Sequence, residues 1–285
     1  RHAANVFRRP FEEKRVADPL VTLALGYFDY ADRPGSAIDL PLEYFAEALA
    51  WLRERCPRTA VWGSSRGAEA ALLTACHFPQ LVDAAVGWVP SHLVNSGLDL
   101  TRGADFSREQ RAMWSLNGKP VPGVALLPPD AALPARDFAT FPGHQFADEF
   151  LARWDALPAG SAFDLPLDDL RAPLFLAAGA DDGLWPAAYG ARRIEQALAD
   201  RPVAVTVSVY DDAGHMIGVP NEVRPFSDVV HWSNGYAGVE SGLVHYGGTP
   251  AGNARAARRS WREVVGFLRE HLSSGASAAA IGSAT

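Results

Sequence analysis

The chain has 285 residues, of which 48% are hydrophobic and 21% are charged, and its formal net charge is −7. This balance is typical of a globular protein with a large buried core and excludes a disordered, collagen-like or low-complexity chain. No face of the sequence is dense in lysine or arginine and the net charge is negative, so nucleic-acid binding is not expected. No apolar run reaches the roughly 18 residues that a membrane-spanning helix needs.

Short apolar runs alternate with amphipathic stretches along most of the chain. The predicted strands are residues 20–26, 59–62, 84–89, 173–178 and 203–210. The predicted helices are residues 1–18, 41–55, 68–78, 146–154, 187–199 and 253–272. This alternation predicts an α/β fold, with a mainly parallel sheet flanked by helices. The run 20–26 (LVTLALG) is continuously apolar, which is typical of a strand buried on both faces.

Three stretches do not follow this alternation. Residues 91–171 are rich in proline and aromatic side chains and are too long for a plain connection, so we expect a cap inserted between two strands. Residues 216–249 are expected to form a long loop, and residues 273–285 a flexible tail. Residues 1–272, with the cap included, are expected to be one catalytic domain.

The strongest motif is Gly63-Ser64-Ser65-Arg66-Gly67, which reads G-x-S-x-G between a predicted strand and a predicted helix. A sharp strand-to-helix turn of this kind lifts the central side chain out of the sheet, and we expect both flanking glycines to be required because a Cβ there would clash. The sequence therefore predicts Ser65 as a nucleophile. The backbone N–H of Arg66, at the helix N-terminus, is the expected first oxyanion donor.

Two aspartates follow the predicted strand 173–178, and one histidine follows the predicted strand 203–210. Either Asp181 or Asp182 is able to orient an imidazole; the spacing to Pro186 favours Asp182, and Asp181 is better explained as a turn residue or a cap. His215, directly after Gly214, is the expected general base. The order serine, aspartate, histidine along the chain is that of the α/β-hydrolase fold.

Other catalytic chemistries find little support. The sequence has no H-E-x-x-H, no C-x-x-C and no GxxxxGK[ST] phosphate loop, so we expect neither a metal nor a cofactor. Cys56 and Cys76 do not make a disulfide framework and are more typical of small buried side chains than of nucleophiles.

At this level of detail the chain resembles a known family, the C-terminal catalytic domain shared by the acyl-CoA thioesterases and the bile acid-CoA:amino acid N-acyltransferase. The matching stretches are residues 23–30 (LALGYFDY), 40–51 (LPLEYFAEALAW), 63–72 (GSSRGAEAAL), 90–91, 116–120 (LNGKP), 179–186, 213–215, 247–250 and 261–272. The resemblance implies an α/β-hydrolase with Ser65, Asp182 and His215 as its triad. In this family the transferase carries cysteine as nucleophile and the thioesterases carry serine, so Ser65 favours hydrolysis of an acyl thioester or ester.

The resemblance also implies structure before residue 1. In this fold a strand and a Gly-rich loop, which gives the second oxyanion donor, precede the strand assigned to 20–26. A parallel sheet without that inner strand would leave unpaired backbone groups, each costing about 1–3 kcal/mol when buried. We therefore expect an N-terminal segment of the same polypeptide to complete the sheet between 20–26 and 59–62. The alternative second donor is the backbone of Tyr27.

The expected cap would cover the pocket and select the acyl group. Its large aromatic side chains are the expected substrate-binding residues: Trp114, Phe141, Phe146 and Trp154. Each of them is equally well explained as holding the cap together. Two other functions stay open, an acyltransferase or cyclase that uses the same triad with a nucleophile other than water, and a binding protein without catalysis.

Overall fold

The structure is a computed structural model that describes residues 20–97, 111–125, 143–218, 229–232 and 242–273. The predicted helix 1–18 lies outside the described residues, as do Phe141 and the tail after residue 273.

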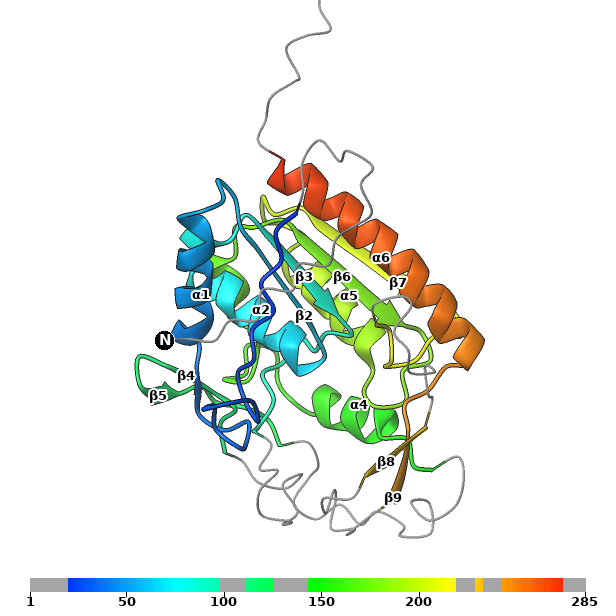
Figure 1. Ribbon diagram of the computed structural model, residues 1–285. Helices are drawn as coiled ribbons and strands as arrows, with labels where there is room; N and C mark the ends of the chain where they lie inside the picture. Colours follow the sequence, from blue (N-terminus) through cyan, green and yellow to red (C-terminus); the bar gives the residue numbers. More distant parts are fainter. Residues whose placement is uncertain (1–19, 98–110, 126–142, 219–228, 233–241, 274–285) are drawn as a thin grey trace, which may run out of the picture.

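A parallel sheet of four strands forms the centre of the described structure (Figure 1). Its strands, in spatial order, are β2 (Ala60–Ser64), β3 (Ala84–Trp88), β6 (Leu174–Gly179) and β7 (Val205–Tyr210). Every residue of β3 and β6 is buried, as expected for the continuous apolar runs of central parallel strands. Because the strands are parallel, their carboxyl ends meet at one edge, and this edge positions the candidate site.

Helices cover both faces of the sheet. The described helices are α1 (Glu43–Arg53), α2 (Arg66–His77), α4 (Ala147–Asp155), α5 (Ala187–Ala197) and α6 (Pro250–Leu272), and of these α2, α5 and α6 contact the strands of the sheet. Phe175 of β6 contacts Phe267 of α6. In the adjacent strand β3, Gly87 faces Ala68 of α2. Since Phe175 pairs with Val86 and side chains alternate along a strand, α2 and α6 lie on opposite faces. The fold is thus an α/β layer structure, as the sequence predicts.

Smaller elements lie outside this sheet. They are the strands β1 (Leu40–Pro41), β4 (Trp114–Leu116), β5 (Lys119–Pro120), β8 (Val229–Trp232) and β9 (Gly242–His245), and the short 3-10 helices Pro79–Leu81 and Leu167–Asp169. Strand β4 belongs to the expected cap and pairs with β1, so this inserted segment is joined to the chain before α1. Strands β8 and β9 form an antiparallel hairpin inside the stretch expected to be one long loop. That expectation is wrong there, because two short β-rich runs pair with each other.

The strand predicted at residues 20–26 is also wrong. The segment forms no strand and contains a single bridge residue, Ala24, and Leu20 and Val21 are 36% and 62% exposed. Apolar content alone suggested burial on two faces, but a strand exists only where neighbours satisfy its backbone. Within the described residues β2 is an end strand of the sheet and does not pair with this segment. A further strand between the two stays a prediction.

Candidate active site

Ser65 lies at the turn between β2 and α2, in a backbone conformation that L-residues rarely adopt. Its φ is 56° and its ψ is −122°, so the turn holds the residue under strain while it presents the hydroxyl above the sheet edge. A Cβ on Gly63 would lie 1.9 Å from the carbonyl oxygen of Gly67, so glycine is required at 63. The same expectation is wrong at Gly67, where an added Cβ would meet only the Tyr27 hydroxyl, at 4.0 Å.

The structure brings Ser65, His215 and Asp182 into one hydrogen-bonded row. His215 Nε2 lies 2.9 Å from Ser65 Oγ, and His215 Nδ1 lies 2.9 Å from Asp182 Oδ2. The side chains of His215 and Asp182 are 5% and 1% exposed. In water-poor surroundings such contacts are electrostatically stronger than in solution, and they are the geometry that lets an imidazole take a proton from a hydroxyl.

Asp182 is fixed by its own loop. Its Oδ1 accepts hydrogen bonds from the backbone N–H groups of Leu184 at 2.9 Å and Trp185 at 3.2 Å, which leaves Oδ2 for the imidazole. Asp181 is exposed and contributes its backbone N–H to the carbonyl of Ala213. Of the two aspartates left open by the sequence, the structure therefore gives the histidine contact to Asp182.

The position of His215 depends on close backbone packing around it. Its N–H donates to the carbonyl of Tyr246 at 2.8 Å, and its ring contacts Tyr246 and Trp185 with centroid distances of 5.6 and 4.9 Å. A Cβ at Gly214 would lie 2.1 Å from the carbonyl oxygen of Gly247, so only glycine allows this approach. The glycine before the histidine is therefore a steric requirement of the site.

Arg66 begins α2, so its backbone N–H is among the first N–H groups of a helix, which have no partner within the helix. That placement suits it to receive a developing oxyanion next to Ser65. Its side chain turns inward, with only 10% exposed, and donates to Glu69 Oε2 at 3.2 Å and to the carbonyl of Ser96 at 2.7 Å. The guanidinium therefore takes part in an internal ion pair.

The Tyr27 side chain lies against the first turn of α2. Its ring contacts Phe28, Phe45 and Trp114, and burial raises the pKa of its hydroxyl to about 12, partly offset by the nearby Arg66 charge. The hydroxyl therefore stays protonated at neutral pH. A role of the Tyr27 backbone as second oxyanion donor stays a prediction.

Three of the four expected substrate-binding aromatics lie in the core. Trp114 and Phe146 are 0% exposed and Trp154 is 3% exposed, and the fourth, Phe141, lies outside the described residues. The Trp114 ring contacts the rings of Phe45, edge to face, and of Tyr27, and Trp154 packs on Phe150. Sequence cannot distinguish a cap aromatic that lines a pocket from one that closes the core beneath it. We therefore correct the prediction and assign these three side chains to packing.

One neighbour of these aromatics, His92, is half-buried. Its ring contacts Trp154 and Tyr189, and its buried Nδ1 has no hydrogen-bond partner in the described part of the chain. Burial, with a smaller effect of Arg193, lowers the pKa of His92 from 6.5 to about 4. The folded protein thus keeps this imidazole neutral where an unfolded chain protonates it.

This difference predicts acid destabilisation. Between pH 6.5 and about 4 the unfolded state binds the extra proton, so the free energy of unfolding should fall as the pH falls through this window. His92→Phe keeps a ring in place and removes the titrating group, so it should reduce that fall by at most about 3 kcal/mol. Denaturant unfolding of wild type and variant at pH 7, 5.5 and 4.5 measures it. Parallel pH dependences for the two proteins would contradict it.

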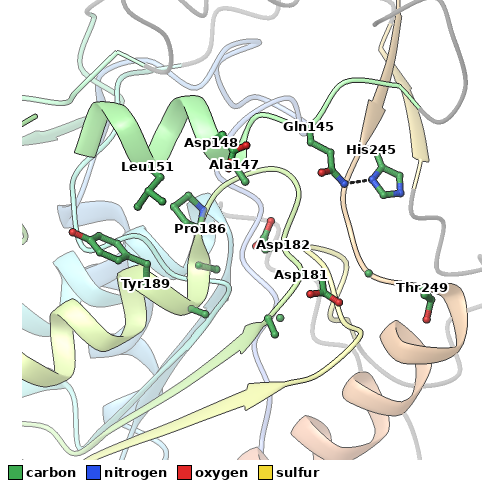
Figure 2. A pocket seen from close by; sticks show the side chains of 15 residues that line it. Gln145, Ala147, Asp148, Leu151, Asp181, Asp182, Pro186, Tyr189, His245 and Thr249 are labelled. Atoms are coloured by element: carbon green, nitrogen blue, oxygen red, sulfur yellow. Dashed lines mark hydrogen bonds between the residues drawn. The ribbon is translucent and has the colours of Figure 1, made fainter. Parts of the chain in front are cut away.

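A cavity of about 610 Å³ opens beside the Asp182 loop (Figure 2). Residues of α4, the Asp182 loop, the start of α5 and the chain after β9 line it, and Gln145 is hydrogen-bonded to His245 at its rim. Neither Ser65 nor His215 lines this cavity. The cavity therefore lies on the Asp182 side of the site and does not include the space above Ser65.

The described residues contain no group of three or more His, Cys, Asp or Glu side chains suited to hold a metal ion. Among the helices of the described segments, none combines the length and apolar character needed to cross a membrane.

Sequence reasoning did not identify a buried polar cluster next to the serine turn, formed by Glu69, Asn95 and Trp114. Glu69 is 1% exposed and receives hydrogen bonds from both of the others. The available signal was an acidic residue within an otherwise small and apolar helix sequence, RGAEAALLTACH.

The parallel sheet, the strained serine turn and the carboxyl-end placement of aspartate and histidine together define an α/β-hydrolase. Residues 143–274 match the family model described as BAAT / Acyl-CoA thioester hydrolase C terminal. Over these residues the chain is similar to that family. It is 26% identical over 271 residues to acyl-coenzyme A thioesterase 6 of Mus musculus and 27% identical over 260 residues to acyl-coenzyme A amino acid N-acyltransferase 2 of Rattus norvegicus.

Each of these two matches covers 88% of this chain but only 53% and 54% of the relative, so the chain spans about half the length of the curated relatives it matches. Among solved structures, similarity is found to a prolyl endopeptidase, with TM-score 0.40 and 16% identity over 81% of this chain and 25% of that chain. A pyrethroid hydrolase is similar with TM-score 0.34 and 16% identity, over 82% of this chain and 79% of that one.

Proposed function

We propose that the protein is a serine hydrolase that cleaves an acyl thioester, of the acyl-CoA type, or an ester through an acyl-enzyme intermediate. The observation that carries the proposal is the row of contacts from Ser65 through His215 to Asp182, each 2.9 Å long. The match of residues 143–274 to the family model, and similarity to proteins named as acyl-CoA thioesterases and N-acyltransferases, support the acyl thioester as substrate.

In the proposed reaction His215 Nε2 takes the proton of Ser65 as Oγ attacks the acyl carbonyl carbon. Asp182 accepts the hydrogen bond of Nδ1–H and stabilises the imidazolium. The negative oxygen of the tetrahedral intermediate lies at the backbone N–H of Arg66 and the amino end of α2. When the intermediate collapses, the bond from carbon to sulfur or oxygen breaks, and the proton on His215 passes to the leaving thiol or alcohol.

In the second half of the reaction a water molecule loses its proton to His215 and attacks the acyl-enzyme. The ester bond to Ser65 Oγ breaks, Oγ recovers the proton, and the free carboxylic acid leaves. Atoms balance without any electron transfer, so the cycle requires no redox cofactor.

Transfer to an amine or hydroxyl is the alternative, because three of the relatives are named as acyl-coenzyme A amino acid N-acyltransferases. The first step would be the same, and only the nucleophile of the second half would differ. The serine at position 65 favours hydrolysis, since the acyl-enzyme it forms is an ester that water attacks when no competing nucleophile is bound.

The test is product analysis on the full-length protein with a panel of acyl-CoA thioesters and simple esters. We expect free acid as the main product, and an intact-mass increase on the peptide that contains Ser65, with glycine or taurine at millimolar concentration changing the product little. Amide as the main product would assign the protein to the transferases. Absence of both products and of any adduct would overturn the proposal.

A further inference from the structure

The carboxylate of Glu69 is buried directly below the serine turn. Glu69 lies in the first turns of α2, and its backbone N–H donates to the carbonyl of Ser65 at 3.2 Å. The residue is 1% exposed. A buried carboxylate is costly unless both oxygens are satisfied. This one accepts four hydrogen bonds, and all four donors come from the protein.

The four donors come from three segments of the chain. Oε2 accepts from Arg66 Nη1 at 3.2 Å and from Asn95 Nδ2 at 2.8 Å. Oε1 accepts from Trp114 Nε1 at 2.6 Å and from the backbone N–H of Asn95 at 3.2 Å. Glu69 therefore joins the start of α2, the chain after β3 and strand β4 at a single point.

Arg66 is held at two places by this arrangement. One guanidinium nitrogen donates to Glu69 and the other to the carbonyl of Ser96, while the guanidinium carbon lies 5.9 Å from the ring of Trp185. Trp185 in turn packs at 90° on His215. The residue whose backbone N–H is the proposed oxyanion donor is thus anchored through its own side chain.

We propose that Glu69 is a positioning residue for catalysis: by holding the Arg66 side chain, it keeps the Arg66 backbone N–H aimed at the oxyanion beside Ser65. The proposal rests on the proposed function of Ser65. A buried ion pair is by itself weak evidence for stability, and replacing one partner leaves the other uncompensated. The Arg66–Glu69 pair is distinguished by its position, because the backbone N–H of Arg66 is the proposed donor to the oxyanion.

Glu69→Gln is the first variant. The amide oxygen is able to accept from Trp114 and from the Asn95 backbone, but its NH₂ group faces two donors, Arg66 and the Asn95 side chain. The Arg66 anchor is therefore lost while size is kept. Because misplacing an oxyanion donor by about 1 Å is expected to cost on the order of 100-fold, we expect kcat per active site to fall about 10- to 100-fold, with KM changed less than about threefold.

Fluorophosphonate titration of Ser65 counts the active sites and separates positioning from folding. A purely structural Glu69 would lower the labelled fraction and Tm but leave kcat per labelled site at the wild-type value. That result would overturn the proposal. Glu263→Gln is the matched control, since Glu263 of α6 also accepts from an arginine, Arg259, and lies away from the site. It should leave kcat per labelled site unchanged.

Arg66→Met gives a second, independent route if Glu69→Gln yields too little folded protein. It removes the guanidinium, keeps an apolar chain and should produce the same loss of kcat. In the double variant the two losses should not add, because both remove one anchor. Additive losses would overturn the proposal. If wild-type protein shows neither labelling nor an acyl adduct, the proposed function fails; if it labels and turns over normally while the variants do too, only the role of Glu69 fails.

Discussion

Ser65→Ala is expected to lower kcat for acyl thioester hydrolysis by roughly 10⁴- to 10⁶-fold. The hydroxyl makes the 2.9 Å hydrogen bond to His215, and alanine is able to adopt the strained turn to the same extent as serine. The variant should therefore fold, bind substrate and form no acyl-enzyme. Steady-state hydrolysis of an acyl-CoA panel and intact mass after brief mixing measure both effects.

Ser64→Ala is the matched control for this change. Ser64 precedes the nucleophile in the same motif, is exposed, and ends β2 opposite Trp88. It should keep activity within about twofold, as surface substitutions of this size usually do. A Ser65→Ala protein with most of its activity, or a Ser64→Ala protein without it, would show that the nucleophile is elsewhere.

Asp182→Asn is expected to lower kcat by about 10⁴-fold at neutral pH. The asparagine oxygen is able to accept the N–H groups of Leu184 and Trp185 as Asp182 Oδ1 does. Its NH₂ group would then donate to His215 Nδ1, which places the imidazole proton on Nε2 and removes the acceptor that Ser65 needs. The loop should stay folded, with a melting temperature close to that of wild type.

Asp181→Asn serves as the control, because it changes the same functional group one residue away. Asp181 is exposed and is not in contact with His215, so its kcat should stay within about threefold of wild type. Measurements of kcat and KM for both variants on one acyl-CoA substrate decide between the two carboxylates. A large loss for Asp181→Asn together with a small loss for Asp182→Asn would reverse the assignment.

The sequence is sufficient to place the sheet, the main helices and the three residues of the hydrogen-bonded row, Ser65, His215 and Asp182. Strands β3 and β6 carry apolar runs that are buried throughout, and Ser65, Asp182 and His215 follow the carboxyl ends of β2, β6 and β7. Parallel strands bring their carboxyl ends to one edge whatever the details of packing. Residues that follow those ends are therefore close in space even when 150 positions separate them in the chain.

The details that sequence missed depend on neighbours from distant segments. The run at residues 20–26 is as apolar as a central strand, but its pairing partners decide whether it becomes one. Trp114 has the character of a pocket residue, but its indole N–H reaches Glu69 and its ring closes the core. Gly63 is sterically required and Gly67 is not, although the motif presents them as equivalent.

The short loop after β6 gives the site a mechanical property of its own. Asp182 holds the amides of Leu184 and Trp185, the Trp185 indole is tied to the carbonyl of Val89, and its ring abuts His215. The loop therefore links the positions of the Asp182 carboxylate and the His215 ring, so a shift of one is expected to shift the other. Changes that tilt the amino end of α5 should consequently slow turnover before they weaken substrate affinity, and such variants would be recognised by a fallen kcat beside a preserved KM.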